Sequence, residues 1–339
     1  MRSEPQSLTW PDGDPQIMFD AVQPVAIAQI EAARTRLEGL SAVSPLIACG
    51  AAPAGKTLFL KLENLQSIGS FKIRPIGNAV LARDRDRLSS GIYTTSTGNS
   101  ALGVAFMARR LGIAATAVVP TNAPEAKLEK LRRLGTRIEM RPTEEWWQAI
   151  KTGVLEGQEG VYIDAVRDPA SLAGDGTIGL EILQQSPDIE AILIPFGGGG
   201  LACGIACAVR ALKPEVKIIA CELASAHPLK AAFDAGAPAE TPHAPGFVSG
   251  VGFGTVLPEM WPLAKSMIDE VITVSLAEVA AAIRIMVEYN HVVAEGAGAV
   301  SVAAALSGRY TEAKVCAVVS GGNLDSSALA TILDGKVPS

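Results

Sequence analysis

The chain has 339 residues, of which 48% are hydrophobic and 19% charged, and its formal net charge is −6. This composition indicates a globular protein with a substantial core, and the acidic balance argues against non-specific nucleic-acid binding. No apolar run reaches the roughly 18 residues of a membrane-spanning helix. We expect residues 1–19 to form a polar arm without a signal-peptide stretch, and the protein to be cytoplasmic, with neither nucleic acid nor membrane as a partner.

Strand and helix patterns alternate along the chain. Helices are predicted at 24–37, 72–87, 100–111, 125–134, 143–156, 174–185, 201–212, 276–289 and 298–306. Strands are predicted at 57–62, 92–95, 114–119, 137–140, 189–195, 217–221 and 313–319. The stretch 227–255 has no regular pattern. Alternation with continuous apolar strands predicts an α/β fold of open, mostly parallel twisted sheets in two lobes, with helices on both faces. In such folds ligands bind at the carboxyl ends of strands.

Cysteine and histidine do not form metal-ligand patterns. The five cysteines contain no Cys-x-x-Cys pair, and the three histidines lack ligand spacing. We therefore expect free, buried thiols in a reducing compartment and no catalytic zinc site.

Lys72 lies in Ser70-Phe71-Lys72-Ile73-Arg74, at the expected start of a helix. A lysine must be neutral to attack a carbonyl, and burial or a neighbouring cation promotes that state. We expect Ser70 to cap the helix and Arg74 to supply the cation. Taken alone, the segment also fits an ordinary lysine at a helix N-terminus.

Four consecutive glycines, Gly197 to Gly200, stand between the apolar strand 189–195 and the helix 201–212. Glycine lets the backbone approach an anion closely, and the helix N-terminus adds about half a positive charge. No Lys-Ser/Thr pair follows, so the run is not a P-loop, and it lacks the acidic residue of a dinucleotide-binding motif. The run predicts a phosphate site rather than a plain turn.

Two other polar loops follow predicted strands. The loop from Ser96 to Ser100 precedes a helix and is rich in small hydrogen-bond donors, which suits a carboxylate or phenolate oxygen. Ser320-Gly321-Gly322-Asn323 follows the strand 313–319, with Ser320 at its carboxyl end. Alone, the first loop also fits a helix cap and the second a plain turn.

Together the four motifs resemble those of the fold-type II pyridoxal phosphate (PLP) enzymes, specifically the serine/threonine dehydratase and serine racemase family. The resemblance covers roughly residues 24–335 and rests on the order and spacing of SFKIR, STGN, GxGT, GGGG and SGGN. It implies a tryptophan synthase β-like fold, with a large PLP-binding domain at 20–87 and 168–335 and a small substrate-loop domain at 88–167. We also expect a homodimer.

The resemblance implies a role for each motif. Lys72 forms the Schiff base with pyridoxal 5'-phosphate and removes the Cα proton, and Phe71 packs beside the pyridine ring. Asn99 binds the cofactor's 3′ oxygen. Ser320 contacts the pyridine nitrogen, where a neutral hydroxyl makes the ring a weaker electron sink and so suits β-elimination. The phosphate is held by Gly197, Gly198, Gly199, Gly200 and Leu201, and the substrate carboxylate by Ser96, Thr97, Asn99 and Ser100.

Several positions depart from the family's motifs. Thr97 stands where serine racemases carry an acid/base on the second face of the cofactor, which argues against efficient racemisation, and Ser100 replaces a histidine. Pro75 replaces a glycine after Arg74. Asp175 replaces the glutamine of Gly-Gln-Gly-Thr, and the sequence does not explain its charge.

The family's cation site is only partly matched. Glu222 and the Ala226 carbonyl fit a site for Mg²⁺ or another divalent or monovalent cation, but Pro228 stands where an aspartate would complete it. We include the site as an expectation.

The implied activity is that of a PLP-dependent ammonia-lyase, or dehydratase. Its substrate would be a small-molecule β-hydroxy amino acid such as threonine, serine, 3-hydroxyaspartate or phenylserine, converted to a 2-oxo acid and ammonia. An amino-acid racemase and a β-replacement synthase of the same fold are the alternatives, although the synthase's Asn-Pro context before the lysine is absent. A non-catalytic ligand-binding relative is a third, disfavoured by the intact Lys72, glycine run and Ser320.

Overall fold

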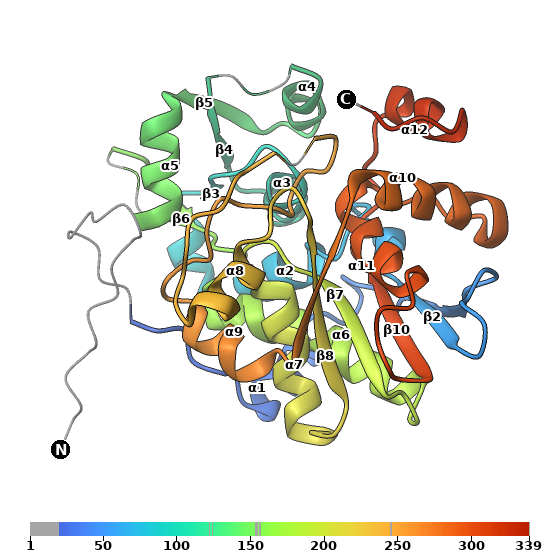
Figure 1. Ribbon diagram of the computed structural model, residues 1–339. Helices are drawn as coiled ribbons and strands as arrows, with labels where there is room; N and C mark the ends of the chain where they lie inside the picture. Colours follow the sequence, from blue (N-terminus) through green and yellow to red (C-terminus); the bar gives the residue numbers. More distant parts are fainter. Residues whose placement is uncertain are drawn as a thin grey trace.

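Two β-sheets, each flanked by helices, organise the protein (Figure 1). The computed structural model describes residues 20–121, 123, 125–152, 155, 157–244 and 246–338. The polar arm expected at residues 1–19 lies outside these residues. No helix in the described part of the chain is long and apolar enough to cross a membrane.

The larger sheet has six strands in the order β1-β2-β10-β7-β8-β9. Only β1 runs antiparallel to its neighbour, and all other pairs are parallel. The strands are β1 (Leu46–Ala48), β2 (Thr57–Leu62), β7 (Ala191–Pro195), β8 (Lys217–Leu223), β9 (Glu270–Val274) and β10 (Lys314–Val319).

The smaller sheet has four parallel strands in the order β5-β4-β3-β6. They are β3 (Ile92–Thr94), β4 (Ala115–Pro120), β5 (Arg137–Arg141) and β6 (Val161–Tyr162). Its helices are α3 (Asn99–Leu111), α4 (Glu125–Arg133) and α5 (Thr143–Thr152). The expected α/β class with two mostly parallel sheets is confirmed, while the domain boundaries stay a prediction.

Helices cover both faces of the larger sheet, as its uniformly apolar strands require. Ile192 and Ile194 of β7 pack into the cluster formed with the helices of one face, while Ala191 and Leu193 pack into the cluster on the other. The first group of helices is α1 (Ile27–Arg36), α6 (Pro169–Gln185), α7 (Gly200–Leu212), α8 (Pro228–Ala235) and α9 (Trp261–Met267); the second is α10 (Leu276–Ile285), α11 (Gly296–Leu306) and α12 (Ser326–Leu333).

Helix α2 (Ile73–Leu81) ends earlier than predicted, and α6 begins earlier. A separate 3-10 turn, η2 (Arg85–Leu88), follows α2. The start of α6 is capped by Asp168, whose side chain accepts from the Ala170 N–H. Glycines in α6 let α2 approach closely: a Cβ at Gly174 would lie 2.4 Å from the Arg74 carbonyl oxygen.

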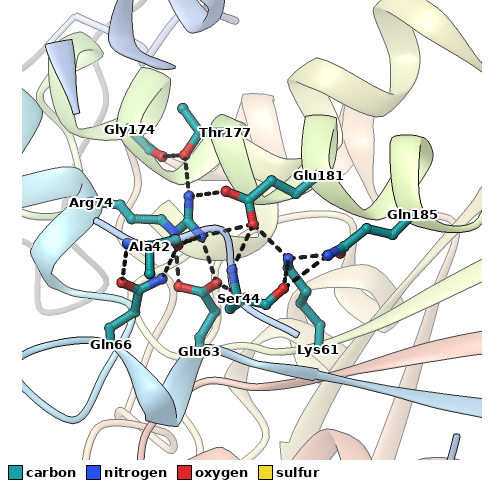
Figure 2. A network of polar contacts seen from close by, with 10 residues as sticks. All are labelled: Ala42, Ser44, Lys61, Glu63, Gln66, Arg74, Gly174, Thr177, Glu181 and Gln185. Carbon is teal, nitrogen blue, oxygen red and sulfur yellow. Dashed lines mark hydrogen bonds and ion pairs between the residues drawn. The ribbon is translucent and has the colours of Figure 1, made fainter. Parts of the chain in front are cut away.

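A buried cluster of four charges joins β2, the 3-10 turn η1 (Glu63–Leu65), α2 and α6 (Figure 2). Arg74 Nε lies 2.8 Å from a Glu63 carboxylate oxygen, and its Nη1 lies 2.7 Å from Glu181. Lys61 Nζ lies 2.5 Å from the other oxygen of Glu181. Two cations and two carboxylates therefore neutralise one another out of water.

The pKa shifts in this cluster follow from its pairing. Burial alone would raise the pKa of Glu63, but the Arg74 guanidinium outweighs burial and holds that pKa below its usual value. Burial alone would likewise lower the pKa of Arg74, and the two carboxylates raise it instead. Arg74 is thus committed to Glu63 and Glu181. The expectation that it acts as the cation beside Lys72 is wrong, and it anchors the helix that begins after Lys72.

We expect Arg74→Met to lower the free energy of unfolding by about 3–5 kcal/mol, because it leaves the buried Glu63 carboxylate without its ion-pair partner. Urea unfolding followed by circular dichroism measures the loss. Lys130→Met is the matched control, since it breaks an exposed pair with Asp325 at 3.3 Å and should cost under about 1 kcal/mol. Equal losses in the two variants would contradict the role given to Arg74.

Candidate functional site

The predicted motifs meet at the carboxyl ends of three adjacent strands. Parallel pairing sets Leu62 of β2 beside Val319 of β10, and β10 beside β7. The chain leaves β2 toward Lys72, leaves β10 at Ser320 and leaves β7 at the glycine run. This is the edge where open parallel sheets bind ligands.

Lys72 is held against the end of β10. The N–H of the preceding residue, Phe71, donates to the Ser320 carbonyl at 2.9 Å, and Ser70 bridges to Gly321. Lys72 occupies the N-cap position of α2, and its Nζ lies 4.8 Å from the Phe71 ring centroid. Ser70 does not cap the helix as expected, because no side-chain cap bond forms and its buried hydroxyl has no partner among the described residues.

The environment of Lys72 favours a neutral amine. Although part of the residue's surface is accessible, burial of the ammonium group lowers the pKa of Lys72. Asp175 and Asp164 oppose this effect through their negative charges without reversing it. A lysine with a lowered pKa is the form that attacks a carbonyl carbon.

Asn99, the first residue of α3, connects the two sheets. Its Nδ2 donates to Glu295 at 2.6 Å, and its Oδ1 accepts from Asn323 Nδ2 at 2.7 Å. The backbone N–H of Glu295 donates in turn to the Gly321 carbonyl at 3.0 Å. An amide nitrogen carries two hydrogens, so both partners orient the Asn99 group while a second hydrogen is left to donate.

The glycine run brings bare backbone to the start of α7. Gly199 is the N-cap of α7 and has φ +97°, which L side chains rarely adopt. A Cβ at Gly197 would lie 2.2 Å from the Gly250 carbonyl oxygen. No side-chain caps this terminus, so the N–H groups of its first turn, including that of Leu201, suit a phosphate. Among the described residues the geometry fits the group predicted from the glycines.

The irregular stretch also reaches this region through Gly250. A Cβ at Gly250 would lie 4.0 Å from Ala297, two residues after Glu295. Gly250 therefore lies between the glycine run and the loop that holds Asn99.

The four residues expected to bind a substrate carboxylate follow β3. Ser96, Thr97, Asn99 and Ser100 are all half-buried, and Ser96 Oγ accepts from the Gly98 N–H at 3.1 Å. No side chain caps α3, which leaves its N-terminal N–H groups open to an anion. One turn on, a Cβ at Gly103 would lie 3.4 Å from the Lys72 carbonyl oxygen, so α3 lies against the Lys72 backbone.

Sequence reasoning assigned no role to Glu295 or Asn323. Asn323 ended a quoted motif, and Glu295 immediately precedes the apolar helix α11. A polar residue at the end of a strand or the start of a helix is the signal that would have pointed to both. Their contact with Asn99 depends on residues about 200 positions apart, which local patterns do not reveal.

Glu222, expected with Ala226 to bind a cation, caps a helix. Its two carboxylate oxygens accept from the N–H groups of Leu229 and Lys230, each at 2.9 Å, at the start of α8. Burial raises the pKa of Glu222 to about 7, and these backbone bonds offset only part of the effect. The described residues contain no cluster of three His, Cys, Asp or Glu side chains able to hold a metal. The cation site stays a prediction, and the contacts favour a capping role.

The raised pKa of Glu222 predicts a pH-dependent stability. Because the folded state binds this proton more tightly than the unfolded state, its contribution to the free energy of unfolding falls as pH rises from about 4.5 to about 7 and is constant above. The difference in unfolding free energy between wild type and Glu222→Gln should show this slope in urea titrations at several pH values. Parallel profiles for the two proteins would contradict it.

The same pair of proteins tests the cation site. A cation bound at Glu222 favours the ionised carboxylate, so Mg²⁺ should raise the melting temperature of wild type and not that of Glu222→Gln. If Mg²⁺ changes the melting temperature of both proteins equally, Glu222 does not bind the cation and only caps α8.

The chain is similar in sequence to known proteins over most of its length. Residues 37–321 match the family model described as "Pyridoxal-phosphate dependent enzyme". The chain is 36% identical over 283 residues to an L-threonine ammonia-lyase of Thermotoga maritima, covering 83% of this chain and 70% of the relative. It is 32% identical to a putative threonine dehydratase of Sinorhizobium fredii, covering 92% and 96%.

The solved structure of maize serine racemase superposes with a TM-score of 0.82 at 30% identity, covering 91% of this chain and 97% of that one. The family match begins directly after α1 and ends at Gly321, so it includes Lys72, the glycine run and Ser320 at the three strand ends. The chain belongs to the pyridoxal-phosphate dependent enzymes, as the lysine, glycine and serine motifs of its sequence had indicated.

Proposed function

We propose that the protein is an ammonia-lyase that removes the β-hydroxyl group of a β-hydroxy amino acid, with threonine or serine as the first candidates, and yields a 2-oxo acid and ammonia. The observation that carries the proposal is the placement of Lys72, with its lowered pKa, directly against Ser320 through the Phe71 bond. The similarity to a threonine ammonia-lyase and a putative threonine dehydratase supports it.

Bound pyridoxal phosphate supplies an electrophilic carbonyl carbon and a ring that accepts the electron pair left at Cα. The bare backbone of Gly197–Gly200 and the first turn of α7 would hold its phosphate. Asn99, oriented by Glu295 and Asn323, would offer its remaining amide hydrogen to the 3′ oxygen.

Ser320 and Lys72 then divide the chemistry. Ser320 would be a neutral partner for the ring nitrogen, and a neutral hydroxyl at that position suits β-elimination. Lys72 Nζ takes the Cα proton, since its lowered pKa leaves it able to act as a base.

The substrate carboxylate binds at the open N-terminus of α3. The N–H groups there and the hydroxyls of Ser96 and Ser100 favour an anion. One turn into α3, Gly103 lies against the Lys72 carbonyl, so the helix that would bind the carboxylate is adjacent to the Lys72 backbone.

We expect purified wild-type protein to carry a visible absorbance band from its lysine-bound cofactor, and Lys72→Ala to lack it, because alanine offers no amine. Spectra after incubation with pyridoxal phosphate measure this. The control is Lys130→Ala on α4, whose exposed ammonium pairs with Asp325, and it should keep the band. A colourless wild-type protein would refute the cofactor role of Lys72.

We expect turnover of at least one β-hydroxy amino acid in an assay that measures 2-oxo acid and ammonia together across L and D isomers. Lys72→Ala should lose turnover, and Lys130→Ala should retain it. Release of the two products in unequal amounts, or no turnover of any substrate by coloured protein, would count against the lyase.

Racemisation is the second candidate, favoured by the similarity to maize serine racemase. Thr97 is half-buried in the loop before α3, and its extra methyl restricts the hydroxyl more than serine does. Thr97→Ser should therefore raise the racemase-to-lyase ratio, measured by chiral chromatography alongside the 2-oxo acid assay. A wild-type protein that racemises faster than it eliminates would reverse the order of the two candidates.

We also infer a homodimer in the cytoplasm. Leu65 and Val293 are 57% and 40% exposed, and Asn64, next to Leu65, donates to the Val293 carbonyl at 3.0 Å, so the two form a local apolar surface. The five cysteines are buried free thiols, as expected in a reducing compartment. Light scattering of the purified protein tests the dimer.

A further inference from the structure

A pair of hydroxyl groups ties the loop expected to bind the substrate carboxylate to the edge strand of the smaller sheet. The hydroxyl of Tyr162, on β6, lies 2.9 Å from Thr95 Oγ1, which is hydrogen-bond distance, and either group can donate. Thr95 is buried and directly precedes Ser96, the first residue of that loop. The start of the loop is therefore held by a side chain from a neighbouring strand.

The pairing of β3 with β6 brings the two hydroxyls together (Figure 1). In the parallel register Tyr93 lies opposite Tyr162, and their ring centroids are 5.3 Å apart. Residues two positions apart face the same side of a strand, which puts Thr95 on the side of β3 where both rings lie. The contact thus follows from the register of the sheet.

The Tyr162 hydroxyl keeps its proton. Burial raises the pKa of Tyr162 to about 12, and the negative charge of Asp164 acts in the same direction. The phenol is therefore neutral at physiological pH, and a neutral phenol can donate to the threonine hydroxyl or accept from it. The bond does not depend on a change of charge in the neutral pH range.

The turn that follows β6 packs against the glycine run. Asp164 Oδ1 accepts from the N–H groups of Val166 and Arg167, at 2.8 and 3.0 Å, which shapes the turn. Val166 then covers two of the glycines. A Cβ at Gly198 would lie 3.0 Å from Val166 Cγ2, and one at Gly200 would lie 3.1 Å from Val166 Cα. One short segment, β6 with its turn, therefore contacts both the loop after β3 and the glycine run.

The turn is itself anchored to other elements. Arg167 Nε donates to Asp164 Oδ2 at 2.6 Å. The Arg167 guanidinium also donates to the Ile150 carbonyl at 2.7 Å, near the end of α5, and to Glu259 at 2.9 Å, shortly before α9. These bonds restrict the turn, so Tyr162 extends from a segment that is fixed on both sides of the protein's two sheets.

We propose that Tyr162 is a positioning residue, whose hydroxyl bond to Thr95 fixes the carboxylate-binding loop, residues 96–100, relative to the glycine run without contacting the substrate. The loop is then held at both ends, because the bonds to Asn99 hold the other one. A loop that is ordered before binding loses less entropy when the substrate arrives. The inference rests on the proposed function, which gives the loop its role as the carboxylate site.

The first test measures the loop in the cofactor-free protein by hydrogen–deuterium exchange and mass spectrometry. Tyr162→Phe removes only the hydroxyl and should raise exchange in the peptide containing residues 96–100 about 2- to 10-fold, the range for one hydrogen bond. Thr95→Val removes the other half of the bond and should act alike, whereas Thr95→Ser keeps a hydroxyl and should not. The double variant should exchange no faster than either single one, because both substitutions remove the same bond.

Tyr93→Phe is the matched control. It removes a phenolic hydroxyl from the residue that pairs with Tyr162, and that hydroxyl bonds to the Leu155 backbone rather than to Thr95. Exchange in the loop should stay at the wild-type level. The positioning role would be overturned by unchanged exchange in Tyr162→Phe and Thr95→Val, or by an equal rise in Tyr93→Phe.

The second test uses cofactor-loaded protein and a β-hydroxy amino acid that the wild type converts. In Tyr162→Phe, KM should rise about 2- to 10-fold while kcat changes little, because substrate binding is weakened and no reacting group is lost. The visible absorbance band without substrate should stay as in the wild type, since Lys72 is unaltered. A fall in kcat at unchanged KM would assign the hydroxyl to the reaction itself and contradict the positioning role.

The two tests distinguish this inference from the proposed function. Faster loop exchange in a protein that converts no β-hydroxy amino acid would support the attachment of the loop to Tyr162 and refute the proposed function. Unchanged loop exchange in an active lyase would refute the attachment and leave the proposed function standing. Faster exchange together with a raised KM supports both.

Discussion

The fold depends on the placement of one guanidinium out of water. Arg74 can remain charged in the interior only because Glu63 and Glu181 both contact it, from η1 and α6. Those contacts hold the end of β2, the start of α2 and the middle of α6 in one arrangement, since any shift would leave a buried charge unpaired. Lys72 immediately precedes α2, so its backbone is positioned by electrostatic requirements rather than by local helix propensity.

Close backbone approach complements this charge pairing. Glycines in α6 let α2 and α7 come nearer than side chains allow, and the glycine run leaves the N–H groups of α7 uncovered. Paired charges thus position the backbone next to the lysine, and the start of α7 carries glycines without side chains. The charge pairing around Arg74 fixes the position of the Lys72 backbone, whereas the glycine run leaves the N–H groups of α7 available to an anion.

Local patterns predicted much of this arrangement. The bounds of β2 were predicted as they occur, and the motifs that follow β2, β3, β7 and β10 lie where strand–helix alternation places them. The two-residue strand β6 and the three-residue strand β1 were missed because their identity comes from pairing with neighbours rather than from a period. Helix α8 was missed for a related reason: it begins at Pro228, and the carboxylate that caps it belongs to β8.

The sequence indicated which residues belong to the candidate site, but it did not indicate which of them contact one another. Lys72, Asn99, the glycines and Ser320 stand out in the sequence because loops after strands carry unusual residues. Glu295 and Asn323 gain their importance from Asn99, which is distant in the chain. Arg74 shows the opposite error, in which a neighbour in sequence was taken for a neighbour in space, although helix geometry turns its side chain toward α6.

The two hydrogen bonds that hold the Asn99 side chain restrict how α3 can move. This residue begins the first helix of the smaller sheet, whereas both side chains that hold it come from loops of the larger one. Any movement of α3 away from these loops would therefore break the two bonds unless the loops moved with it. Because we propose that Asn99 binds the cofactor's 3′ oxygen, loss of these two bonds would also release its amide group from the orientation that this role requires.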